Sequence, residues 1–125
     1  MKNTFLDSLS PVFRLKAMEL LARCVEMRIP VAIINTLRSQ EEQEENLIKG
    51  VSWTRNSKHL PQPPDGLARA IDIAPYEIFL ISGPDKLAWD AKYPAWQVIG
   101  LVGESLGLRW GGKWKIPDLG HFEDV

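Results

Sequence analysis

The stretch "ARAIDIAPY" (68–76) constrains the fold most, because it sets a carboxylate inside an apolar alternation. Ile71 and Ile73 alternate with Asp72 and two alanines, which is the two-residue period of a β-strand. Such a strand directs its isoleucines to one face and Asp72 to the other. We therefore expect a sheet that buries one face and presents Asp72 on the opposite face.

Helical and strand patterns follow one another irregularly along the rest of the chain. They predict helices over 11–28 and 39–50, a helix from Pro94 to Gly107, strands over 31–35, near Trp110 and around His121, a loop over 51–65 and a turn over 81–86. No βαβ repeat joins the strands, so we expect an α+β fold with a small, mainly antiparallel sheet packed with helices. The 125 residues contain no repeat or linker, so residues 1–125 are expected to form one domain.

Several local signals support these helices. Ser10 and Pro11 form a helix start, and Ser39 with Glu42 forms a capping box. Apolar residues of the first helix recur at helical spacing: Val12, Leu15, Ala22, Val25 and Ile29. The sole cysteine, Cys24, lies in this helix and is expected to be buried. In the helix after Pro94, Gly100 and Gly103 are expected to allow close packing.

Charge and hydropathy exclude some classes of function. The net charge is −1, from 15 basic and 16 acidic residues, which argues against a general electrostatic grip on nucleic acid. No apolar run approaches the roughly 18 residues of a membrane span. The N-terminal segment lacks the apolar stretch of a signal peptide, so we expect synthesis in the cytoplasm without membrane insertion.

The two histidines, His59 and His121, carry the chemistry that is easiest to read from the sequence. Each has carboxylates nearby, namely Asp65, Asp72, Asp118 and Glu123. Two histidines and one carboxylate are a sufficient ligand set for catalytic zinc, and a further carboxylate could act as the base. Spacing alone does not choose that base between Asp118 and Glu123, and it leaves open that the histidines are only packing residues.

At these residues the chain resembles the zinc peptidoglycan peptidases. This family includes D-alanyl-D-alanine carboxypeptidases and the L-alanyl-D-glutamate endopeptidases used as phage endolysins. The resemblance rests on Ser57-x-His59, Ala70-x-Asp72 and Asp118-x-x-His121, together with the upstream segment "LRSQEEQ". It extends from about Ile33 to Glu123 and implies the small α+β fold of these peptidases.

The resemblance also implies roles for individual residues. It assigns His59, Asp72 and His121 as ligands of Zn²⁺ and Asp118 as the general base and acid. It assigns Arg38 to the developing oxyanion, Ser57 to orienting the substrate or the site, and Trp110 and Trp114 to the wall of the groove. Glu123 remains a candidate for a hydrogen bond to a ligand imidazole.

The expected function is therefore a zinc peptidase that cuts peptidoglycan stem peptides, with the L-alanyl-D-glutamate bond as the first choice. The alternatives are a D-alanyl-D-alanine carboxypeptidase and a non-catalytic wall or phage-particle protein that keeps the fold. The endolysin resemblance also implies a monomer that reaches the cell wall after holin-assisted release.

Two features depart from the family pattern. His59 and Asp72 lie 13 positions apart (72 minus 59), farther than in compact members, and the additional residues are "LPQPPD". We expect this spacer to project beside the groove, since lengthening a loop costs little entropy. Asp65 within it is a weak competitor as a ligand. Lys113 stands where many relatives have aspartate.

Overall fold

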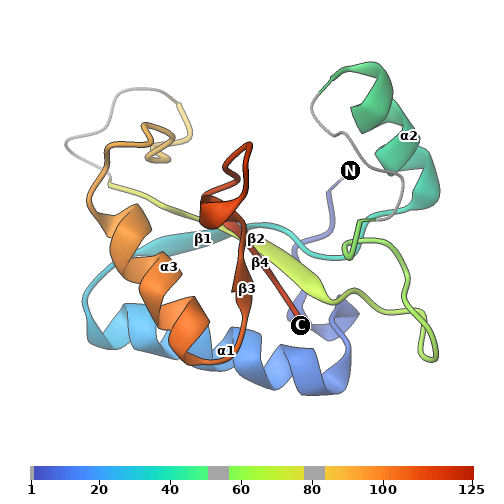
Figure 1. Cartoon of the computed structure of the whole chain (residues 1–125), viewed down its shortest axis with the longest axis horizontal. Coiled ribbons are helices and arrows are strands. Elements are labelled where there is room, and N and C mark those ends of the chain that lie inside the picture. Colours follow the sequence, from blue (N-terminus) through green and yellow to red (C-terminus); the bar gives the residue numbers. More distant parts are fainter. Residues whose placement is uncertain (1, 51–56, 78–83) are drawn as a thin grey trace.

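The computed structural model describes residues 2–50, 57–77 and 84–125, which form a four-stranded antiparallel sheet with helices against it (Figure 1). The strand order is β1-β2-β4-β3. In chain order the elements are η1 (Leu6–Ser8), α1 (Pro11–Glu26), β1 (Val31–Asn35), α2 (Gln40–Ile48), β2 (Ala70–Pro75), α3 (Ala95–Ser105), β3 (Arg109–Trp110), η2 (Gly111–Lys113) and β4 (His121–Glu123). The predicted α+β class with an antiparallel sheet is confirmed.

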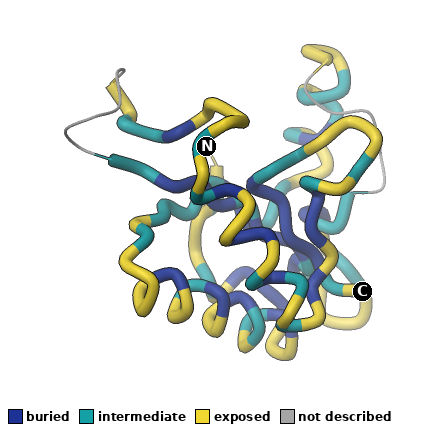
Figure 2. Tube along the Cα trace, turned by 60° about the vertical axis from the view of Figure 1, so that its left-hand side comes forward, coloured by how far each residue is buried: buried dark blue, intermediate teal, exposed yellow. Residues whose placement is uncertain are grey.

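The core lies between one face of this sheet and the two helices α1 and α3. Ile71 and Ile73 of β2 and Phe122 of β4 are almost fully buried there, as the alternation around Asp72 predicted. Figure 2 shows buried strands and exposed outer turns of the helices. Helix α2 stands on the other side of the sheet from α1 (Figure 1). The face of β2 that carries Asp72 is therefore not covered by α1 or α3.

Helix α1 buries mostly other residues than those whose spacing predicted the helix. Val12, Leu15 and Val25 are 69%, 68% and 75% exposed, whereas the buried residues of the helix are Phe13, Ala17, Leu20 and Cys24. The predicted helix is confirmed, but it carries apolar residues on two sides, and periodicity alone does not choose which side is buried. The predicted burial of Cys24 is confirmed, and this burial raises the pKa of its thiol to about 11.

Helix α3 approaches the sheet through its glycines, as predicted. A Cβ atom built on Gly100 would lie 2.3 Å from the indole of Trp110, and one on Gly103 would lie 2.4 Å from the ring of Phe122. The helix ends before Gly107, whose φ of +84° suits glycine. Glycine thus lets two aromatic rings of the sheet lie directly against the helix backbone.

The other predicted elements agree with the structure within one or two residues at their ends. The Ser39–Glu42 capping box is present, with both of its hydrogen bonds. Residues 51–56 of the predicted loop and 81–83 of the predicted turn lie outside the described residues. Within the described ranges, every helix is too short or too polar to cross a membrane.

We predict that Gly103→Val destabilises the protein by about 1–3 kcal/mol, because the new side chain overlaps the buried Phe122 ring. Thermal unfolding followed by circular dichroism measures this change. Leu101→Val is the matched control, since it places the same residue at a 60% exposed position of the same helix. Equal midpoints for the two variants would contradict the close packing of α3.

Candidate active site

Three side chains from three segments meet on the face of the sheet opposite the core. Asp72 of β2 and His121 of β4 are direct partners in the antiparallel register, so their side chains share a face. His59 comes from the loop before β2, where its carbonyl oxygen accepts a hydrogen bond from the Arg38 amide at 2.7 Å. One ligand atom from each of the three lies within 4.8 Å of the others.

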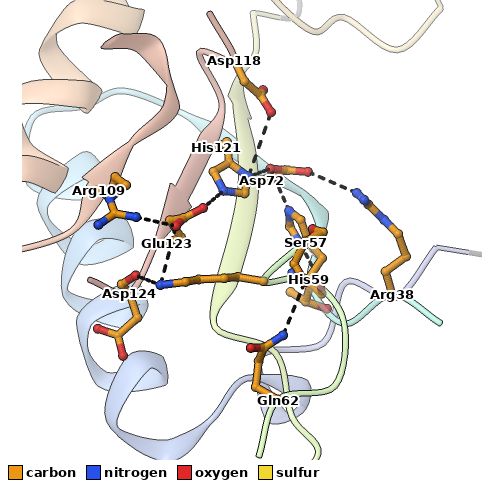
Figure 3. Close-up of polar contacts among 12 residues, drawn as sticks. Arg38, Ser57, His59, Gln62, Asp72, Arg109, Asp118, His121, Glu123 and Asp124 are labelled. Carbon is orange, nitrogen blue, oxygen red and sulfur yellow. Dashed lines mark hydrogen bonds and ion pairs between the residues drawn. The ribbon is translucent and has the colours of Figure 1, made fainter. Parts of the chain in front are cut away.

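Both imidazoles turn a ring nitrogen toward the same carboxylate oxygen (Figure 3). His59 Nε2 lies 3.1 Å and His121 Nδ1 lies 3.0 Å from Asp72 Oδ1. The opposite ring nitrogens are fixed by acceptors: His59 Nδ1 donates to the Thr36 carbonyl at 2.7 Å, and His121 Nε2 donates to Glu123 Oε1 at 2.8 Å. Each imidazole is therefore held in the orientation that suits a metal ligand.

The hydrogen bonding of His59 indicates that His59, Asp72 and His121 are suited to binding a metal ion. His59 is 2% exposed, and its Nε2 atom makes no hydrogen bond in the described part of the chain, although it lies 3.1 Å from Asp72 Oδ1. Because Nδ1 donates to Thr36, the Nε2 of the neutral ring is an acceptor that faces an acceptor oxygen. A buried polar atom without a partner is rare and calls for an explanation. Two imidazole nitrogens and one carboxylate oxygen are donors that zinc prefers, so His59, Asp72 and His121 could hold this metal.

The carboxylates and imidazoles of this cluster shift one another's pKa values. Burial opposes the ionisation of Asp72, but the facing imidazoles of His59 and His121 hold the pKa of Asp72 well below its usual range. Burial likewise opposes a charged His121, yet its hydrogen bonds to Asp72 and Glu123 raise the pKa of this imidazole to about 9. A metal that binds His121 Nδ1 must therefore displace a proton.

Asp118 stands at the rim of the cluster, with Oδ2 4.0 Å from His121 Nδ1 and its side chain 46% exposed. Burial and the nearby Asp72 carboxylate raise the pKa of Asp118 above its ordinary value. Gly111 makes this placement possible, because a Cβ there would lie 2.6 Å from the Asp118 carbonyl oxygen. A carboxyl group that binds a proton more readily than usual is suited to proton transfer.

These side chains line a cavity of about 810 Å³. Arg38 lies in its wall, with its guanidinium 3.9 Å from Asp72 Oδ2 and 2.5 Å from the side-chain oxygen of Gln43. Trp114 also lines it, with its ring centroid 4.9 Å from that of His121. The cavity thus combines a possible metal site, a carboxyl group, a cation and an aromatic wall.

Comparison with known proteins identifies the family. Residues 50–124, more than half of the chain, match the model of a family described as D-alanyl-D-alanine carboxypeptidase. The chain belongs to this family. It is therefore an enzyme, a zinc-dependent peptidase of peptidoglycan, as the resemblance implied.

The crystal structure of the Serratia marcescens L-Ala D-Glu endopeptidase ChiX has the same fold. It aligns with a TM-score of 0.68 and 23% identity, over 100% of this chain and 90% of that chain. No curated protein matches the chain. The likeness to the solved structure covers the segment before residue 50, which the family match leaves out.

Of the residues that the family resemblance singled out, Trp110 lies away from the cavity. It is 3% exposed, packs in the core beneath Gly100, and donates its indole N–H to the Leu119 carbonyl at 2.8 Å. The expectation that Trp110 lines the groove is corrected, because its ring lies on the core side of the sheet. Ser57 does line the cavity, and its hydroxyl accepts the backbone N–H of His59 at 3.1 Å.

The spacer between His59 and Asp72 contributes no residue to the lining of the cavity. Its expected position beside the groove stays a prediction. The Arg69 amide donates to the Lys58 carbonyl at 2.9 Å and so closes the loop at its base. Asp65 accepts hydrogen bonds from the Ser10 hydroxyl and the Leu67 amide. Asp65 is therefore engaged at the start of α1 and does not compete as a ligand.

Sequence reasoning missed several cavity residues: Lys2, Ile34, Asn35, Asn46, Lys58, Trp89 and Arg109. Lys58 and Arg109 converge on Glu123 Oε2, at 3.6 Å and 3.4 Å. Figure 3 shows the contact of Arg109 with Glu123. Burial disfavours the ionised Glu123, but His121 and these two cations hold its pKa below the ordinary value. Among the missed cations only Lys58 had a signal in the sequence, namely its place next to His59.

We predict that Glu123→Ala weakens zinc binding by about 10- to 100-fold, because His121 loses the acceptor that orients its ring. Competition with a chromophoric chelator measures the affinity. Glu19→Ala, at an exposed acidic residue of α1, is the control. If Glu123→Ala binds zinc as tightly as this control, Glu123 does not position the ligand.

Proposed function

We propose that the chain is an L-alanyl-D-glutamate endopeptidase that binds Zn²⁺ through His59, Asp72 and His121. The observation that carries this proposal is the convergence of two oriented imidazole nitrogens on Asp72 Oδ1. The buried His59 Nε2, which makes no hydrogen bond among the described residues although it faces Asp72 Oδ1, also supports it. When bound, the metal supplies a Lewis acid for the scissile carbonyl and lowers the pKa of a water molecule.

The chain's own residues fix the geometry in which this chemistry occurs. The Thr36 carbonyl and the Glu123 carboxylate hold the two imidazoles by their outer nitrogens. The Ser57 hydroxyl binds the amide of His59 and so shapes the loop that carries this ligand. Such fixed partners keep the reacting groups aligned without reorganisation during the reaction.

Asp118 is the proposed general base and acid. Its carboxylate takes a proton from the attacking water and then gives it to the nitrogen of the departing amine, while the carbon–nitrogen bond breaks. The raised pKa of Asp118 favours this return of the proton. Its half-exposed side chain at the rim leaves room for substrate.

Arg38 is the proposed stabiliser of negative charge on the scissile carbonyl oxygen. Its guanidinium is held between Asp72 and Gln43 and is only 13% exposed, so it is fixed before substrate arrives. A preorganised cation of this kind stabilises charge that develops in the transition state. Trp114, beside His121, is the proposed aromatic wall for the stem peptide.

The choice of bond has two candidates. The likeness of the fold to an L-Ala D-Glu endopeptidase over the whole chain supports the endopeptidase, while the family description supports cleavage of D-alanyl-D-alanine. A carboxypeptidase needs a cation for the terminal carboxylate. Among the cations that line the cavity, Arg38, Lys58 and Arg109 each face a carboxylate of the chain itself, which leaves Lys2 as the candidate for this task.

We further propose that the enzyme acts as a phage-type endolysin. It would be made in the host cytoplasm, reach the wall through a membrane lesion formed by a holin, and act as a monomer. The endolysin resemblance of the sequence supports this setting.

We predict that the zinc-loaded protein digests purified peptidoglycan and leaves new free amines on D-glutamate, detectable by mass spectrometry. Prior chelation should abolish the products, and added Zn²⁺ should restore them. Release of D-alanine instead would favour the carboxypeptidase. No cleavage of either bond by the zinc-loaded protein would exclude both proposals.

We predict that Asp118→Ala lowers the rate of cleavage by about 10²- to 10⁴-fold, because the proton acceptor is lost. Zinc affinity should stay close to that of the parent, since Asp118 is outside the set of three ligands. Lys115→Ala, at an exposed position three residues earlier, is the control. Full activity in Asp118→Ala would show that another group transfers the proton.

A further inference from the structure

Asn35, the last residue of β1, lies directly beside the proposed metal site. In the antiparallel register of β1 and β2, Ile33 pairs with Ile73 and Asn35 pairs with Asp72. Ile34 is therefore an additional residue, a β-bulge in the edge strand. Directly opposed residues of an antiparallel pair point to the same face, so the bulge turns Asn35 toward the face that carries Asp72.

The side chain of Asn35 is buried, yet its oxygen is not satisfied. Asn35 is 3% exposed, and its Oδ1 atom has no hydrogen-bond partner within the described residues. Burying an amide oxygen in this way costs free energy, and native proteins rarely tolerate it without a function. Asn35 also lines the cavity, so a bound molecule can reach the region of this amide.

The neighbouring polar groups on the same segment are already engaged. The Thr36 hydroxyl bonds to Asn3 and Ser8, and the Thr36 carbonyl accepts from His59. Arg38 bonds to Gln43. Asn35 Oδ1 is thus the buried side-chain atom of this segment for which the described residues provide no hydrogen bond.

Two buried polar atoms of the cavity wall make no hydrogen bond among the described residues, His59 Nε2, which faces Asp72 Oδ1, and Asn35 Oδ1. A bound metal would account for the first. We infer that Asn35 is a substrate-binding residue whose side-chain oxygen accepts a hydrogen bond from a main-chain N–H of the stem peptide. This inference rests on the proposed peptidase function and adds a residue that recognises the peptide itself.

The chemistry of the side chain matches such a ligand. A primary amide offers both acceptor and donor atoms, as a peptide unit does, and it carries no charge that would perturb Asp72. Asn35 approaches Asp72 from β1, whereas His121 approaches it from β4. The Arg38 guanidinium, on the segment that continues from β1, faces the other oxygen of Asp72, Oδ2. Asn35 and Arg38 therefore hold the peptide from the β1 side of the site.

The test compares Asn35→Leu and Asn35→Ala with the parent enzyme, all loaded with zinc, on a purified stem peptide. Leucine has nearly the volume of asparagine but no amide group. Alanine also removes the amide, and it is small enough to avoid a steric clash that leucine could cause. We expect kcat/KM to fall by about 10- to 100-fold in both variants. Zinc affinity should be retained, and the thermal midpoint should be unchanged or higher, because an unsatisfied buried oxygen has been removed.

Gln40→Leu is the matched control, an amide-to-leucine change at an exposed position of α2, and it should behave as the parent. Parent-like kcat/KM in both Asn35 variants would overturn the inference while leaving the peptidase intact. Loss of stability or zinc affinity in parallel with activity would also overturn it, since Asn35 would then be structural. Failure of the parent itself to cleave the stem peptide would instead reject the proposed function.

Discussion

One carboxylate oxygen, Asp72 Oδ1, organises this molecule's site. It lies about equally far from the two imidazoles, 3.1 Å from His59 and 3.0 Å from His121, while the other oxygen faces Arg38. Asp72 itself is carried by β2, which pairs with β1 on one side and β4 on the other. The two strands that bring Asn35 and His121 to the cavity are therefore both hydrogen-bonded to the strand that carries Asp72.

The same strand joins the site to the hydrophobic core. Ile71 and Ile73, on either side of Asp72, are 1% exposed and pack beneath α1 and α3. Because strand side chains alternate between faces, displacement of Asp72 would also displace two buried isoleucines. Burial of apolar surface on one face of β2 thus holds the polar residues of the opposite face in fixed positions. Polar groups on that opposite face can therefore remain without hydrogen bonds until a ligand binds.

The sequence predicts the parts of this structure that depend on local order. Alternation around Asp72 and the Ser39 capping box follow from neighbouring residues, and both are present. The bulge at Ile34 depends on the pairing of two strands, so nothing in "VAIIN" reveals that Asn35 faces the cavity. The burial of Trp110 under α3, likewise, follows from tertiary packing and not from its type. Glycine spacing in α3 predicted close packing without identifying the ring that fills the space.

The number of residues in the spacer between His59 and Asp72 does not determine how these two side chains are placed in the site. Its base is closed by the bond from the Arg69 amide to the Lys58 carbonyl, its Gln62 and Leu67 are paired, and its Asp65 is held by Ser10. His59 and the buried Leu60 and Ala68 lie within this base, and the Gln62–Leu67 pair closes a tip whose residues 63–66 are exposed. The number of residues in the tip therefore sets the size of a surface feature, while these bonds hold the backbone that carries His59 and leads to Asp72. A foreign peptide grafted at Pro63 or Pro64 would be displayed on the outside of an intact enzyme.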